Sequence, residues 1–204
     1  MKTLLIFLIA TAAWAGEEVK LQGVRVVGGD KKYVELTGKV SLTNNILEFI
    51  AVEPGGRDYE SLLTVDCKPS ALKFGLLLIG CEDGATNGSR LVIEVEWQSA
   101  GKSRRVPIET WMLDRHTGKT PAPLPFFFSG SNFVPDLFTS NQVFQADAEQ
   151  AHIALWWQPS ILINVHDAPG SPYQGEAQGF EVNTQLVPPV GTPVKLILRK
   201  RDER

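Results

Sequence analysis

Hydrophobic and polar residues alternate with a period of two along much of the chain. Over residues 33–42 the apolar side chains of Val34, Leu36, Val40 and Leu42 alternate with polar ones, which predicts a strand with one buried face. The pair Asn44-Asn45 tolerates positive φ, so we expect a hairpin that returns through residues 46–52.

A second hairpin is predicted further along. Apolar residues from Leu91 to Trp97 share one strand face, and Ala100-Gly101 turns the chain toward residues 106–110. The same alternation predicts further strands at residues 61–65, 126–130, 143–146, 151–157, 180–184 and 194–198. The expected fold is therefore mainly β, a single antiparallel β-sheet or sandwich domain over residues 16–204, with α+β as the alternative.

One segment has helical periodicity instead. Residues 69–79 begin with Pro69, which suits the first position of a helix, and Gly80 follows as a C-terminal cap. The segment is apolar on nearly every side, which predicts a buried helix packed on the sheet. A buried strand over residues 75–79 is the weaker alternative.

Two cysteines flank this segment. Cys67 precedes the predicted helix and Cys81 follows it. A helix of that length separates them by roughly 20 Å, whereas a disulfide needs Cα atoms about 4.4–6.8 Å apart. We therefore predict two buried thiols that are not bonded to each other.

The N-terminus has the pattern of a secretory leader. Lys2 precedes an apolar run over residues 4–10, and Ala13-Trp14-Ala15 is an A-x-A cleavage site. We expect a signal peptide over residues 1–15, cleaved between Ala15 and Gly16, and a periplasmic or secreted mature chain. No later apolar run is long enough to span a membrane.

Composition narrows the function without identifying it. The formal net charge is −3 and 21% of the residues are charged, so nothing predicts a nucleic-acid partner. Sequence motifs for nucleotide binding and for common hydrolases are absent. His116, His152 and His166 lack the spacing of a metal site, and nothing predicts a cofactor. His116 lies in a predicted turn, Asp114-Arg115-His116-Thr117-Gly118.

Glu60 is the most informative single residue. It ends the segment PGGRDYE at 54–60, where a glycine turn leads into an apolar strand. A carboxylate there can belong to a site, accept hydrogen bonds in the turn, or form an ion pair with Arg57. The adjacent Trp156 and Trp157 point to opposite faces if they lie in a strand, so one of them is a candidate for an exposed binding patch.

Several segments together resemble a known family. They are PGG at 54–56, YESLL at 59–63, KPS at 68–70 and LLLIG at 76–80, followed by WMLD at 111–114, FSGS at 128–131, EVNT at 181–184 and VPPVGTPV at 187–194. In this order they resemble the YdjY-like domain of secreted bacterial proteins, over about residues 24–198. The resemblance implies a family but no particular activity.

Two positions depart from that family. Relatives often carry His at the positions of Tyr59 and Lys73, where a His-Glu-His cluster with Glu60 would suit a metal or acid–base site. Tyr and Lys are poor ligands for divalent metals at neutral pH. We therefore predict a structural contact of Glu60 with Lys73 or Arg57, and no stoichiometric metal.

These observations favour an exported, non-catalytic binding or assembly module at the bacterial cell envelope, whose partner is an envelope protein or polymer. Candidate binding residues are Glu60, Lys73, Trp156 and Trp157. The alternatives are an envelope hydrolase that uses Glu60 and a metal-binding envelope protein. An enzyme requires titratable groups that converge in one pocket, whereas a binding module requires an exposed apolar or aromatic patch.

Overall fold

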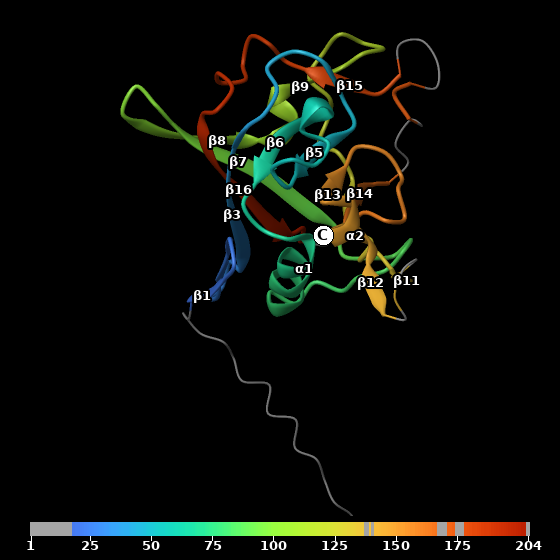
Figure 1. Ribbon diagram of the computed structural model, residues 1–204. Helices are drawn as coiled ribbons and strands as arrows, with labels where there is room; N and C mark the ends of the chain where they lie inside the picture. The colour runs from blue at the N-terminus through green and yellow to red at the C-terminus, as the bar shows by residue number, and fades with distance from the viewer. Residues whose placement is uncertain (1–17, 137–138, 140, 167–170, 174–177, 203–204) are drawn as a thin grey trace, which may run out of the picture.

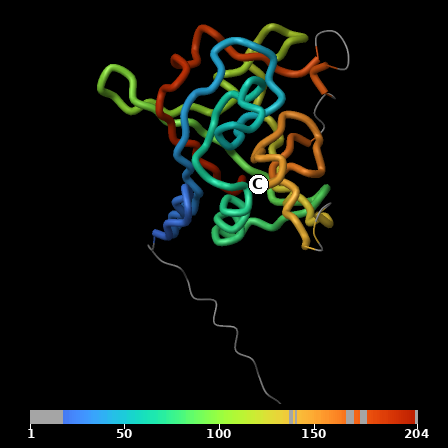
Figure 2. The backbone as a smooth tube through the Cα atoms, in the orientation of Figure 1, coloured from blue at the N-terminus to red at the C-terminus, as the bar shows by residue number. Residues whose placement is uncertain are grey.

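A computed structural model describes residues 18–136, 139, 141–166, 171–173 and 178–202 of the chain. Strands account for 43% of the residues and helical segments for 13%, so the predicted mainly β class is confirmed. Most strands belong to one large, twisted sheet, and helix α1 lies against one end of it (Figure 1). The chain trace shows the β7–β8 hairpin projecting from one side of the molecule (Figure 2).

The large sheet has 11 strands, and its main path runs β10-β14-β13-β5-β6-β3-β16-β7-β8. Strands β1 and β2 extend it from β3. The pairs β5–β6 and β13–β14 are parallel, so the sheet is mixed rather than purely antiparallel. The strands are β1 (Glu18–Leu21), β2 (Val24–Val27), β3 (Tyr33–Val40), β5 (Phe49–Val52), β6 (Ser61–Val65), β7 (Leu91–Ser99), β8 (Lys102–Pro107), β10 (Phe126–Phe128), β13 (Ala151–Ala154), β14 (Ile163–Val165) and β16 (Pro193–Lys200).

Two small sheets and four helical segments complete the described fold. One small sheet has the order β4-β15-β9 and the other pairs β11 with β12. Their strands are β4 (Ile46–Leu47), β9 (Met112–Asp114), β11 (Phe133–Pro135), β12 (Gln142–Phe144) and β15 (Phe180–Val182). The helices are α1 (Pro69–Leu78) and α2 (Gln145–Glu149), with the 3₁₀ segments η1 (Asp58–Glu60) and η2 (Ile108–Trp111).

Of the two predicted hairpins, one is confirmed and one is wrong. β7 and β8 pair directly, and their turn residues Ala100 and Gly101 have φ of 50° and 73°. The turn thus has positive φ at both positions, which matches the twist of the flanking strands. Beyond Asn44-Asn45, however, β4 pairs with β15, and β5 pairs with β6 and β13. Distant strands therefore take the positions that the predicted return strand was expected to fill.

Of the other predicted strands, residues 61–65 match β6 in both bounds and the rest hold with shifted bounds, except one. The predicted strand at residues 143–146 is split between β12 and α2, so its second half is helical. Gln150 ends α2 with φ of 54°, and Ala146 is fully buried. Strands β1, β2, β9, β11 and β14 were not predicted, and all five have three or four residues, too short for a clear alternation.

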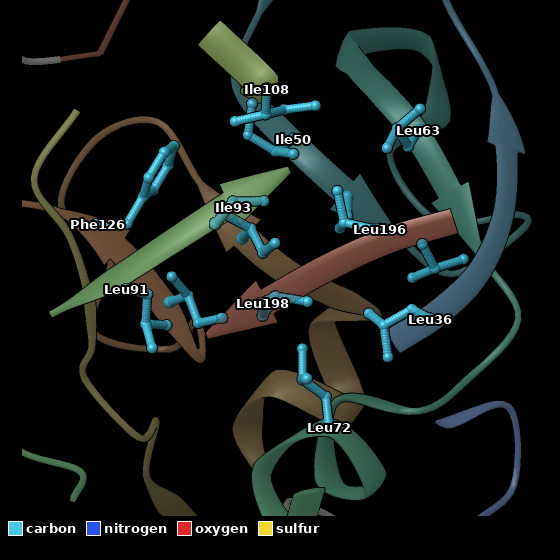
Figure 3. Close-up of a cluster of buried hydrophobic side chains, with 14 of the residues drawn as sticks. Leu36, Ile50, Leu63, Leu72, Leu91, Ile93, Ile108, Phe126, Leu196 and Leu198 are labelled. Carbon is cyan, nitrogen blue, oxygen red and sulfur yellow. The ribbon is translucent and has the colours of Figure 1, made fainter. Parts of the chain in front are cut away.

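The predicted helix is confirmed as α1. Pro69 occupies its first turn, and Gly80 follows it with φ of 83°. Leu72 points from α1 toward Leu198 and Leu36 of the sheet (Figure 3), and all three are fully buried. The expectation that most sides are covered is wrong on the outer side, because Phe74 and Leu77 are 52% and 43% exposed. These two side chains lie three residues apart and so share one helix face.

Cys67 and Cys81 are both free and buried, as predicted from the length of the helix between them. Burial raises the pKa of Cys67 to about 12 and that of Cys81 to about 11. Neither thiol is therefore ionised at neutral pH, and neither is activated as a nucleophile. No helix within the described residues is both long and apolar enough to cross a membrane.

Candidate functional site

The segment that carries Glu60 is a compact turn before β6. Gly55 has φ of 85°, a conformation that favours glycine, and the Gly56 N–H donates to the Glu53 carbonyl at 3.0 Å. The hydroxyl of Ser41 donates to the carbonyl of Asp58, and the hydroxyl of Ser61 donates to that of Arg57. These bonds attach the turn to its neighbours, and it presents Tyr59 outward and Glu60 inward.

Glu60 lies beside a second buried carboxylate, Glu48. Each residue is only 7% exposed, and the Glu48 N–H donates to the Glu60 carbonyl at 3.0 Å. Glu48 sits between β4 and β5, and its own carbonyl accepts the Leu155 N–H at 2.9 Å. Burial raises the pKa of the Glu48 carboxyl, the charge of Glu60 raises it further, and Arg57 lowers it. The two glutamates are therefore joined through the backbone, and the neutral form of the Glu48 carboxyl is favoured more than in an ordinary glutamate.

Tyr173 joins this pair from a distant part of the chain. Tyr173 lies close enough for the Glu60 and Glu48 carboxylates to act on its phenol, and the residue is 59% exposed. Burial of the phenol and the charges of Glu60 and Glu48 raise the pKa of Tyr173, so the phenol stays protonated as a hydrogen-bond donor at neutral pH. Tyr59, which is 63% exposed, is close enough to raise the pKa of Tyr173 slightly further.

An open groove of about 360 Å³ adjoins the outer side of the turn. Tyr59 and Val190 are its most exposed apolar lining residues, at 63% and 60%. The groove is lined by Lys39, Val40, Ser41, Leu42, Pro54, Asp58, Tyr59, Thr64, Val190 and Gly191. Neither Glu48 nor Glu60 belongs to this lining, so the buried carboxylates lie behind the turn whose outer residues line the groove.

Thr64 is the unusual member of the groove lining. It is a β6 residue with only 3% exposure, and its hydroxyl has no hydrogen-bond partner within the described residues. A buried hydroxyl without a partner costs about 1–3 kcal/mol. A ligand that reached Thr64 and supplied a hydrogen bond would recover part of that free energy.

The cations expected near Glu60 pair with other groups. Lys73 forms an ion pair with Asp83 at 2.7 Å and donates to the Gly130 carbonyl at 2.8 Å. The Arg57 guanidinium forms an ion pair with Glu149 at 3.0 Å and lies 4.2 Å from the centre of the Phe49 ring. Arg57 does contact Glu60, but through the backbone, where the Glu60 N–H donates to its carbonyl at 3.3 Å. Of the two structural contacts predicted for Glu60, the one with Arg57 is therefore made through the backbone, and none with Lys73 is found among the described residues.

The two tryptophans differ in exposure. Trp157 is 42% exposed and stacks on Phe127 of β10 with ring centres 5.6 Å apart. Trp156 is half-buried, and its indole Nε1 is buried without a partner in the described part of the chain. Neither residue lines the groove beside Tyr59. Trp157 remains a candidate contact residue on a separate surface.

The histidines are spread over the fold. His116 lies in a turn closed by the Asp114 carboxylate, whose Oδ1 accepts its N–H at 2.8 Å. His152 is fully buried in β13, and its Nε2 is 2.8 Å from the Cys67 carbonyl. His166 packs edge-on against Phe127. Across the described ranges, no group of three or more His, Cys, Asp or Glu side chains gathers in a way that suits a metal ion.

A comparison with protein-family models matches the YdjY domain over residues 26–199, which is most of the chain. The chain belongs to the YdjY domain family. No curated protein and no solved structure gives a significant match. The resemblance drawn from the short motifs is thereby confirmed, and the YdjY domain includes the turn, both buried carboxylates and the groove.

Within this YdjY domain, Tyr59 and Lys73 do not converge on one site. Tyr59 faces the groove, whereas Lys73 lies on α1 against Asp83 and Phe144. Sequence reasoning missed Glu48, Tyr173 and Thr64, which come from three separate strands or loops. Glu48 is the one with a sequence signal, since a carboxylate there interrupts the apolar run of residues 46–52.

Proposed function

We propose that this YdjY-domain protein is an exported, non-catalytic module that binds a cell-wall polymer in the groove beside Tyr59. One observation carries the proposal. An exposed aromatic side chain and a buried hydroxyl without a partner in the described chain line the same open groove. The first offers a flat contact surface and the second a directional hydrogen bond, which together suit a ligand of mixed polarity.

The size of the groove favours a polymer segment over a folded protein partner. A volume of about 360 Å³ lies within the range of ligand sites, about 300–1,000 Å³. A stable protein–protein interface buries about 800 Å² on each partner, and Tyr59 and Val190 supply little of that area. Because the groove is open, a long chain can lie along it with one unit against the exposed Tyr59 ring.

Export is supported by the leader pattern of residues 1–15. A soluble module with a polymer-binding groove would meet the cell wall after cleavage at Ala15-Gly16. In the mature protein Gly16 is the expected first residue, and the mass of protein recovered from the envelope of an expressing bacterium tests this. An intact leader on that protein would contradict export by this route.

The binding experiment uses the mature chain and insoluble peptidoglycan, with co-sedimentation as the measurement. Tyr59→Ala removes the exposed ring, and we expect on the order of tenfold weaker binding. The matched control is Phe133→Ala, since Phe133 is 64% exposed on β11 and does not line the groove. Binding that is absent in the natural sequence, or equally weak in both variants, would contradict the proposal.

Thr64→Val separates binding from folding. The substitution keeps the shape of the side chain and removes the hydroxyl, which lacks a partner among the residues that the structure describes. We expect this variant to be as stable as the natural sequence or about 1 kcal/mol more stable, and yet to bind the polymer less tightly. A loss of stability together with unchanged binding would show that the hydroxyl has a structural partner instead.

An envelope hydrolase is the second candidate, and the carboxylate pair favours it. A Glu48 carboxyl with a raised pKa beside a second carboxylate is the arrangement of an acid and a base. It ranks second because neither carboxylate lines the groove. Release of soluble fragments from the peptidoglycan, abolished by Glu60→Gln, would favour the hydrolase over the binding module.

A further inference from the structure

A second and larger cleft lies where strand β16 ends. It has a volume of about 720 Å³ and shares no lining residue with the groove beside Tyr59. The loop before β3, the strands β7 and β8, and the residue after α1 all contribute to it. Its lining consists of Asp30, Lys31, Lys32, Tyr33, Ile79, Glu94, Arg105, Ile197, Arg199, Lys200 and Asp202.

The charge of this cleft is opposite to that of the whole chain. Five of the lining residues are cationic and three are acidic, although the protein carries a formal net charge of −3. One of the acids is already engaged, since Glu94 pairs with Arg199 at 3.3 Å and with Arg105 at 3.8 Å. Lys31 and Lys32 are exposed and form no ion pair within the described residues. Positive charge is therefore concentrated here and only partly neutralised.

The base of the cleft is rigid and apolar. Ile197 and Ile79 are only 2% and 6% exposed, and Tyr33 beside them is half-buried. Ile197 belongs to β16, which is paired on both sides by β3 and β7. Arg199, two residues further along, projects from the same face as Ile197, because alternate residues of a strand share a face. The cationic groups thus surround a base that the central strands hold in place.

We infer that this cleft binds a phosphate group. The lining is more positive than negative by two charges, which complements the charge of about −1.5 to −2 on a phosphate monoester at neutral pH. Arg105 and Arg199 have side chains 42% and 45% exposed, so each guanidinium can turn part of its donor set toward an anion. Guanidinium groups match phosphate oxygens in pairs, and lysine ammonium groups add charge without fixed geometry.

The experiment uses the mature chain and two phosphate sources at low salt. Inorganic phosphate is titrated while the backbone amide signals of Lys31, Lys32 and Arg199 are followed by NMR. Co-sedimentation is measured with vesicles that contain phosphatidic acid, whose headgroup is a phosphate monoester, and with neutral phosphatidylcholine vesicles. We expect saturable shifts of the three amides or selective binding to the anionic vesicles, weakened by added salt. If the amide signals shift but the protein does not bind the anionic vesicles, the ligand is a soluble phosphate compound. If the protein binds the anionic vesicles, with or without amide shifts, the ligand is a lipid headgroup.

A charge-matched pair of variants decides whether the cleft is responsible. Lys31→Glu/Lys32→Glu reverses two cations in the lining, and we expect about tenfold weaker binding or more. Lys102→Glu/Arg104→Glu makes the same change of net charge on exposed β8 residues outside the lining, and we expect it to weaken binding less than about twofold. Equal weakening by both variants, or no binding of either probe by the natural sequence, would overturn the inference.

Discussion

At the scale of single residues, His152 is the clearest case of a titratable group whose chemistry is set by its surroundings. It is fully buried, and its Nε2 lies 2.8 Å from the Cys67 carbonyl and 3.6 Å from the Cys67 sulfur. Burial lowers the pKa of His152 to about 4. With the pKa of the Cys67 thiol raised to about 12, the two groups are both neutral and cannot act as a nucleophile and base.

This histidine makes folding stability dependent on pH. In the unfolded chain His152 takes up a proton near pH 6.5, whereas in the folded chain it does so near pH 4. Between these values the unfolded state binds more protons, so the free energy of unfolding falls as the pH falls. The full loss is about 3 kcal/mol. Denaturant unfolding of the natural sequence and of His152→Gln, measured from pH 7 to pH 4, tests this.

We expect the stability of His152→Gln to depend much less on pH than that of the natural sequence. The control is His116→Gln, because His116 is exposed in a turn and its removal should leave the pH dependence unchanged. Raised carboxyl pKa values at Glu48, Glu53 and Glu109 act in the opposite direction, since those groups bind protons more readily when folded. Comparison between variants removes this shared contribution. Equal slopes in all three proteins would contradict the assignment to His152.

At the scale of elements, α1 has two different faces. Gly75 faces the sheet, where an added Cβ would lie 3.2 Å from Val24 and 3.3 Å from Val26, so the helix can approach β2 closely. The opposite face carries Phe74 and Leu77, both exposed. Lys73 lies on the flank, with its ammonium 5.4 Å from the centre of the Phe144 ring. Attachment of α1 to the sheet therefore depends on its inner residues.

Two leucines of α1 allow a matched test of this asymmetry. Leu72→Ala removes a fully buried side chain, and we expect the free energy of unfolding to fall by about 2–5 kcal/mol. Leu77→Ala is the same substitution on the exposed face of the same helix, and we expect a change below about 1 kcal/mol. Helix propensity is common to both variants and cancels in the comparison. Similar losses measured by denaturant unfolding would show that the outer face is also covered.

Sequence patterns predicted the elements whose signals are local. The β7–β8 turn and the start of α1 depend on residues adjacent in the chain, Ala100-Gly101 and Pro69. The predicted pairing of the strand after Asn44-Asn45 was wrong because its actual partner strands lie far away in the sequence. Phe49 pairs with Ala154, more than 100 residues later, and Ile46 pairs with Glu181. A period of two identifies a strand but says nothing of its partner.

The candidate site was predictable to the same limited extent. Glu60 could be named as a candidate site residue from the sequence, because it ends a glycine turn that leads into an apolar strand. Its neighbours Glu48 and Tyr173 were not, because only the folded sheet and the loop before β15 bring them together. The Lys73 ammonium does not contact Glu60 but pairs with Asp83, which follows α1 and is brought beside Lys73 only by the fold.

At the scale of the whole molecule, one large hydrophobic cluster connects both ends of the described chain. It contains Val24 of β2 and Leu198 of β16, and it includes both cysteines and Leu72 of α1. The groove beside Tyr59 and the cationic cleft are separate surface features that share no lining residue. A shared core of this kind predicts that the sheet and α1 unfold together.

The two buried thiols report on that cooperativity without any substitution. In the native protein both are protonated and inaccessible, so we expect neither Cys67 nor Cys81 to react with an alkylating reagent. As denaturant is added, both should become labelled over one transition that coincides with the loss of far-UV circular dichroism. Peptide mass mapping after quenching follows each cysteine separately, and a fully unfolded sample sets the limit of complete labelling. Labelling of Cys81 at clearly lower denaturant than Cys67 would mean that the C-terminal end of α1 opens separately, because the thiol beyond that end would then be exposed while the sheet remained folded.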